Sequence, residues 1–126
     1  MTKILTIGLH PRELDYSLHP GLDEATLTAR IEQGHRALLA AGFDAELCLV
    51  DADPDAAEKT VRERLSRASF DLAGIGAGLR VAPEHTILFE RLINVLVGAS
   101  PGIRFFFNSS PETTIDAIRR QLHGPS

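Results

Sequence analysis

The chain has 126 residues, of which 44% are hydrophobic and 24% are charged, and its formal net charge is -4 at pH 7. This length suits one domain with one hydrophobic core, and the composition is far from that of disordered chains. The 13 Lys and Arg residues are scattered among 17 carboxylates, so there is no basic stripe to neutralise a nucleic-acid backbone. We therefore predict a single ordered domain over residues 1–126 that does not bind nucleic acid.

The cysteine content and the apolar stretches predict a cytoplasmic protein. Cys48 is the single cysteine, so no disulfide can form within the chain. Residues 1–7 run directly into a strand-like pattern and lack the apolar region and cleavage site of a secretory signal. No apolar stretch approaches the roughly 20 residues that a membrane-spanning helix needs. We expect a cytoplasmic location and no association with a membrane.

Four strand–helix units are predicted one after another along the chain. In order, they are strand 3–9 with helix 23–41, strand 43–50 with helix 55–68, strand 70–76 with helix 84–99, and strand 102–108 with helix 111–122. The strands are short runs of aliphatic, β-branched and aromatic residues, and the helices repeat apolar residues at helical spacing. The connection over residues 9–22 is long for a strand–helix loop, which makes it a candidate lid.

Capping residues mark the ends of the first and last helices. Asp23 is the predicted N-cap of the first helix, and Gly42 is its C-terminal stop. Ser110 is the predicted N-cap of the last helix, and Pro111 suits the first helical position because its missing N–H would be unpaired there anyway. Glu112 then complements the helix dipole.

Strands that alternate with helices predict a parallel sheet joined by right-handed crossovers, with helices on both faces. We therefore predict a three-layer α/β/α fold with a four-stranded parallel sheet in the order 2-1-3-4. This topology resembles that of flavodoxin-like and Rossmann-like domains, without the fifth strand that usually follows.

The loops after the strands lack the fingerprints of the common nucleotide and metal sites. Segment 8–12 (GLHPR) matches neither the dinucleotide-binding glycine pattern nor a Walker P-loop. It also lacks the Ser/Thr-rich loop of flavodoxins and the acidic residues of response-regulator receivers, which share this topology. Segment 74–80 (GIGAGLR) contains a G-x-G, but Val81 stands where the third glycine is required. Since the histidines also lack metal-ligand spacing, we predict no cofactor and no metal.

Polar residues gather instead at the carboxyl ends of the predicted strands, where open parallel sheets bind ligands. His10 follows the first strand and is the candidate general acid or base, since imidazole titrates near neutral pH. The candidate ligand-binding residues are Arg12, Asp51, Gly76, Gly78, Arg80, Asn108 and Ser109. Guanidinium groups and the N–H groups of helix starts attract anions. We therefore predict a small anionic ligand, a carboxylate or a phosphate.

Each candidate residue also has an ordinary structural explanation. Asp51 suits a turn, while Asn108 and Ser109 suit a turn followed by a cap. The glycines of segment 74–78 suit a tight strand exit with close packing. His10 could simply end its strand.

Apolar surface predicts a homodimer and an alternative function. Strand 102–108 is an edge strand with three consecutive phenylalanines, and helix 84–99 is apolar on more than one face. These surfaces would be covered by a second copy of the chain; the alternative is that a compact sheet buries both faces of strand 102–108. The alternative to a ligand-binding protein is therefore a homodimeric interaction or regulatory module without small-molecule chemistry.

Overall fold

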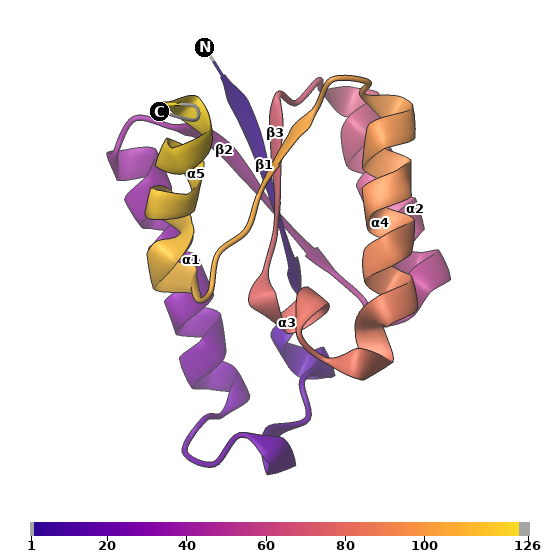
Figure 1. Ribbon diagram of the computed structural model, residues 1–126. Coiled ribbons are helices and arrows are strands. Elements are labelled where there is room, and N and C mark those ends of the chain that lie inside the picture. The colour runs from indigo at the N-terminus through magenta and orange to yellow at the C-terminus, as the bar shows by residue number, and fades with distance from the viewer. Residues whose placement is uncertain (1, 124–126) are drawn as a thin grey trace.

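The computed structural model describes residues 2–123 and has helices on both faces of a parallel sheet (Figure 1). The sheet has 4 strands in the order β2-β1-β3-β4. The strands are β1 (Lys3–Leu9), β2 (Asp44–Val50), β3 (Leu72–Ile75) and β4 (Arg104–Phe106). All neighbouring strands are parallel, which confirms the predicted fold class and strand order.

Two helical layers flank the sheet, as Figure 1 shows. One layer contains α1 (Glu24–Ala40) and α5 (Thr114–Leu122), and the other contains α2 (Pro54–Arg67) and α4 (Thr86–Ala99). A single turn, α3 (Ala77–Arg80), follows β3 directly. Short 3-10 turns lie at Pro11–Glu13, Tyr16–Leu18, Pro83–His85 and Pro111–Thr113. Within residues 2–123, no helix is long and apolar enough to cross a membrane.

The structure shortens the two later strands relative to the predicted segments 70–76 and 102–108. Gly102 has a φ of 92° and turns the chain before β4 begins, which delays the start of that strand. The predicted glycine-rich loop after β3 contains α3, because Leu79 is fully buried and anchors a helical turn there. The predicted cap at Asp23 is present, whereas Ser110 caps the 3-10 turn Pro111–Thr113 and α5 itself begins later, at Thr114.

The hydrophobic core is much larger on the α2/α4 face of the sheet than on the α1/α5 face. The α2/α4 face buries Leu5, Ile7, Leu9, Cys48, Val50, Ala57, Val61, Phe70, Ala73, Ile75, Leu79, Leu88, Leu92, Val95 and Leu96. The α1/α5 face buries only Ile4, Leu38, Leu72, Phe106, Ala117 and Ile118. This smaller core leaves part of the α1/α5 face without packed side chains.

The two central strands explain this difference, because their side chains shrink toward the carboxyl end on the α1/α5 face. Alternate residues of a strand share a face. On this face β1 carries, in order, Ile4, Thr6 and Gly8. β3 and the residue after it carry Leu72, Gly74 and Gly76. The register pairs Ile4 with Leu72 and Thr6 with Gly74, so the side chains shrink together on both strands.

Gly74 is required by the packing of its neighbour on β4. A Cβ atom at Gly74 would lie 2.2 Å from Cε2 of Phe106, whose side chain is almost completely buried. This ring fills the space above the β3 backbone and ends the small core. Beyond it toward the strand ends, the α1/α5 face is open.

Candidate functional site

A cavity of about 330 Å³ lies at the carboxyl-terminal half of the sheet, on the α1/α5 face. Its lining includes the small strand residues Thr6, Gly8, Gly74 and Gly76. Helix α1 lines the cavity with Leu27, Arg30, Ile31, Gly34, His35 and Leu38. The cavity therefore occupies the space that the shrinking side chains of β1 and β3 leave free, and its volume is within the range of small-molecule sites.

The remaining lining is mostly apolar. Strand β2 contributes Leu47 and Leu49, and the long loop after β1 contributes Leu14, His19 and Leu22. The candidate lid is thus part of the cavity lining. A lining of this kind favours contact with the apolar part of a ligand, and a few polar groups then fix the orientation of the ligand.

The ionisable side chains that line the cavity are all basic. They are His19, Arg30 and His35. Within the described residues, no Asp or Glu side chain lines the cavity. A negatively charged group would meet no carboxylate in this lining.

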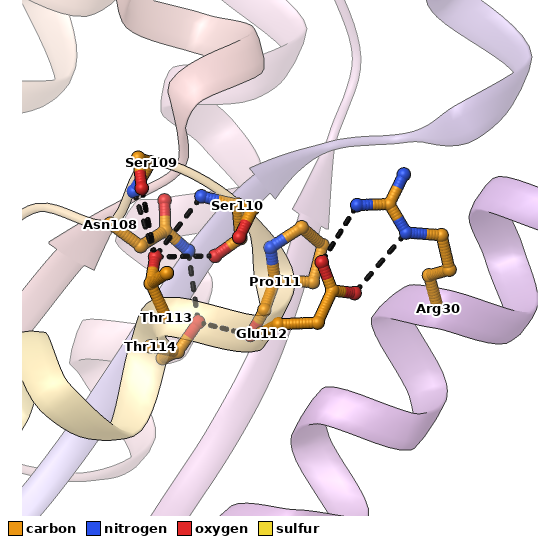
Figure 2. A network of polar contacts seen from close by, with 8 residues as sticks. All are labelled: Arg30, Asn108, Ser109, Ser110, Pro111, Glu112, Thr113 and Thr114. Atoms are coloured by element: carbon orange, nitrogen blue, oxygen red, sulfur yellow. Dashed lines mark hydrogen bonds and ion pairs between the residues drawn. The ribbon is translucent and has the colours of Figure 1, made fainter.

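Arg30 reaches from α1 to the start of α5, where it pairs with Glu112 (Figure 2). Its Nε and Nη2 atoms donate to the two carboxylate oxygens at 3.2 and 2.8 Å. Hydrogen bonds from Arg30 lower the pKa of Glu112, and the same bonds raise the pKa of Arg30. The pair orients the guanidinium beside the cavity while Nη1 takes no part in it.

The amide of Asn108, at the exit of β4, has a defined orientation (Figure 2). Its Nδ2 donates to Thr114 Oγ1 at 2.9 Å, and the Thr114 hydroxyl donates to the Pro111 carbonyl at 2.8 Å. A hydroxyl has one proton, so Thr114 can only accept from Asn108. The amide oxygen of Asn108 therefore points away from Thr114.

Two buried polar atoms at the cavity have no hydrogen-bond partner within residues 2–123. They are Nδ1 of His35 and Oδ1 of Asn108, and both residues belong to the cavity lining. An unpaired buried polar atom costs about 1–3 kcal/mol, and native proteins contain few of them. These atoms are therefore the first candidates to pair with a ligand.

The structure brings together part of the site predicted from sequence. The predicted residues that line the cavity are Gly76, Gly78, Asn108 and Ser109. The predicted residues outside its lining are His10, Arg12, Asp51 and Arg80.

His10, Arg12 and Asp51 form a separate group at the ends of β1 and β2. Nη2 of Arg12 lies 3.4 Å from Oδ2 of Asp51, and Nδ1 of His10 accepts the Arg12 N–H at 3.2 Å. A hydrogen bond with Glu13, followed by one from the Asp53 N–H, lowers the pKa of Asp51. These contacts attach the first part of the long loop to the turn before α2.

Arg80 joins the ends of β3 and β4. Its Nε donates to the Ile75 carbonyl at 2.9 Å, and its Nη2 donates to the Asn108 carbonyl. The guanidinium also lies 5.1 Å from the ring centre of Phe107, a cation–π contact. Burial lowers the pKa of Arg80. Because the β3–β4 ladder ends at Gly74, Arg80 connects the two strands beyond it.

The N–H groups before α5 are already paired. Those of Ser109 and Ser110 donate to Oγ1 of Thr113 at 3.0 and 3.1 Å (Figure 2). Ser110 and Thr113 form a capping box, a local motif that satisfies helix-start donors. Without rearrangement, these groups cannot serve an anion.

No family model matches the chain, and no curated protein matches it. Functional assignment therefore rests on the chemistry of the cavity. Within residues 2–123, no group of at least 3 His, Cys, Asp or Glu side chains is placed to hold a metal ion. Cys48 is fully buried and burial raises the pKa of its thiol, so it is not an activated nucleophile. The geometry supports binding more directly than covalent chemistry.

Proposed function

We propose that the protein binds a small, mainly apolar organic acid in the cavity described above. The observation that carries the proposal is the lining itself, which is apolar except for a few polar groups and whose ionisable members are all basic. The apolar body of the ligand would pack between α1 and the leucines of β2. Its carboxylate would lie near Arg30 and His35.

A carboxylate fits this cavity better than a phosphate does. Phosphate sites in parallel α/β folds use several free backbone N–H groups at a helix start. Here the Ser109 and Ser110 N–H groups donate to Thr113 instead. Arg12 and Arg80 do not line the cavity, whereas Arg30 does and keeps Nη1 outside its pair with Glu112. The proposal therefore places recognition of the anion at the cavity lining on α1.

The direct test is a binding screen by calorimetry and thermal shift. The probes are indole-3-acetate, 3-phenylpropionate and octanoate, each paired with its uncharged amide, together with inorganic phosphate. The acids are expected to bind more tightly than their amides, and a ligand at about 100 times its Kd adds about 2.7 kcal/mol to stability. Absence of binding by every acid would contradict the proposal.

Two arginine variants provide a matched comparison. Arg30 and Arg12 each pair with one carboxylate, but only Arg30 lines the cavity. We expect Arg30→Ala to weaken binding of the acids by about tenfold, which corresponds to about 1.4 kcal/mol. Arg12→Ala should leave it unchanged. Equal effects of the two substitutions would place the anion outside the proposed cavity.

The second candidate is a cytoplasmic homodimeric interaction module. It is favoured by exposed apolar side chains on the α3–α4 side and at the β4 edge. Val81 is 72% exposed, Ile87 is 65% exposed and Phe107 is 38% exposed. Exposed apolar groups beside an unpaired strand edge are a common feature of association surfaces. This function would need no occupant in the cavity, so the binding screen separates the two candidates.

A further inference from the structure

We infer that Asn108 selects acids whose apolar part carries a hydrogen-bond donor, such as a ring N–H or a hydroxyl group, and that Thr114 sets this selectivity. The inference rests on the proposed function, since it concerns a ligand of the same cavity. It adds the chemical feature that distinguishes the ligand from other apolar acids.

The hydrogen-bond chain behind Asn108 determines what the residue offers. Pro111 contributes a carbonyl, which can only accept, so it takes the single proton of Thr114. Thr114 is then an acceptor for Asn108, and Nδ2 of the amide occupies it. The free end of the amide is consequently Oδ1, an acceptor. An acceptor with a fixed direction recognises donors and disfavours other acceptors.

The donors around Asn108 are paired with other atoms. Arg80 donates to the backbone carbonyl of Asn108, not to its side chain. The N–H groups of Ser109 and Ser110 donate to Thr113. Oδ1 is left without a partner among the described residues. The missing donor is therefore expected to come from the ligand.

The position of Asn108 fits this role. It lines the cavity, while Arg30 and His35 line it from α1. A ligand with its carboxylate near α1 can thus extend its apolar part toward the exit of β4. Oδ1 is closed to solvent in this conformation, so the atoms that cover it must move when a ligand pairs with it. A site that pairs with a ligand donor discriminates strongly against an analogue without it, because the buried acceptor would remain unpaired.

The experiment compares two acids of nearly the same shape. Indole-3-acetate has a ring N–H, and benzofuran-3-acetate has a ring oxygen at the same position. Calorimetry on the full chain is expected to show about tenfold tighter binding of the indole acid. In Asn108→Leu this ratio should fall to about one. In Thr114→Val the amide is free to turn Nδ2 toward the cavity, so the ratio should fall or reverse.

Thr60→Val is the control, because Thr60 lies on α2 outside the cavity lining and its hydroxyl, like that of Thr114, donates to a backbone carbonyl, in this case that of Ala56. Its ratio should equal that of the natural chain. If Asn108→Leu does not fold, Thr114→Val still decides the result, since valine closely matches threonine in shape. Equal binding of both acids by the natural chain would overturn the inference and leave the proposed function standing. A ratio that persists in Thr114→Val would also overturn it. Failure of both acids to bind, together with the others in the screen, would instead reject the proposed function.

Discussion

At the scale of single residues, a side chain's surroundings decide its role more than its type does. Arg12, Arg30 and Arg80 each carry the same guanidinium. Arg12 pairs at the surface with Asp51, Arg30 pairs beside the cavity with Glu112, and Arg80 donates to two backbone carbonyls. Arg12 therefore attaches a loop, Arg30 joins α1 to the turn before α5, and Arg80 connects two strands. Substitutions at this scale should have correspondingly different effects.

Gly74→Ala should destabilise the protein by about 1–3 kcal/mol, the usual cost of adding a methyl group to a packed core. The added Cβ would meet the Phe106 ring at 2.2 Å, and the ring is enclosed by the small core of the α1/α5 face. Denaturant unfolding measures the effect. The control is Gly98→Ala on α4, where nothing lies within 4 Å and alanine favours the helix. Similar free energies of unfolding for the two variants would contradict this account of Gly74.

Glu112→Gln should make stability less dependent on pH in acid. Hydrogen bonds from Arg30 lower the folded-state pKa of Glu112 from its ordinary value of 4.5. A lowered pKa means that the pair stabilises the fold above about pH 4.5 and that this contribution is lost as pH falls through the folded pKa. The free energy of unfolding of Glu112→Gln should therefore fall less steeply below pH 4.5 than that of the natural chain.

The matched control for Glu112 is Glu32→Gln, because Glu32 lies on α1 and forms no ion pair within the described residues. Its pH profile should follow that of the natural chain. Parallel profiles for all three proteins would show that the Arg30–Glu112 pair does not stabilise the fold.

At the scale of elements, the side chain of Arg80 connects β3 and β4 beyond the end of their hydrogen-bond ladder. Their ladder pairs Leu72 to Gly74 with Arg104 to Phe106, and the chains then separate around α3. Arg80 spans this gap with hydrogen bonds to carbonyls of both segments. The two hydrogen bonds of Arg80 therefore position Asn108 and also hold β3 and β4 together.

Arg80→Lys should lower the free energy of unfolding by about 2 kcal/mol, because an ammonium cannot reproduce two diverging guanidinium hydrogen bonds together with the cation–π contact to Phe107. Amide hydrogen exchange should also quicken at residues 107–110. Arg62→Lys serves as the control, since Arg62 makes an exposed pair with Glu58 within α2. Unchanged exchange in Arg80→Lys would show that the strand ends hold together without this residue.

Much of this element-scale structure can be predicted from the sequence, and part of the site cannot. The parallel sheet follows from the alternation of strands and helices, and Asp23 caps α1 by local chemistry, as predicted. The direction of Arg80 depends on which carbonyls the end of a ladder leaves unpaired, which only the packed structure shows. His35 could have been predicted from the sequence, because it lies four residues after Ile31 and so shares its helix face. The cavity could also have been predicted, because side-chain size decreases along β1 from Ile4 to Thr6 to Gly8.

At the scale of the whole molecule, the prediction of a homodimer concerns the edge formed by β4. Phe107 contacts the rings of Phe89 and Phe105, and together they form an aromatic group beside the edge. Phe107 and Ile87 remain 38% and 65% exposed. A second copy would cover such a surface more completely.

Sedimentation velocity should therefore show a dimer, and the double substitution Phe107→Ser with Ile87→Ser should shift it to monomer. Leu18→Ser is the control, because Leu18 is 67% exposed in the loop after β1, away from the β4 edge. A natural chain that stays monomeric at high concentration would contradict the predicted homodimer.

The shrinking of side chains along β1 also has an evolutionary consequence. A Cβ at Gly8 would meet only Leu49, at 3.4 Å, so alanine can be accommodated there. Alanine also has less backbone freedom than glycine in the unfolded chain, so Gly8→Ala should raise the melting temperature while it reduces affinity for any occupant of the cavity. This single substitution would therefore raise stability and weaken binding. If the proposed ligand is bound, relatives that have lost this binding would be expected to carry alanine here, and relatives that have kept it would be expected to carry glycine.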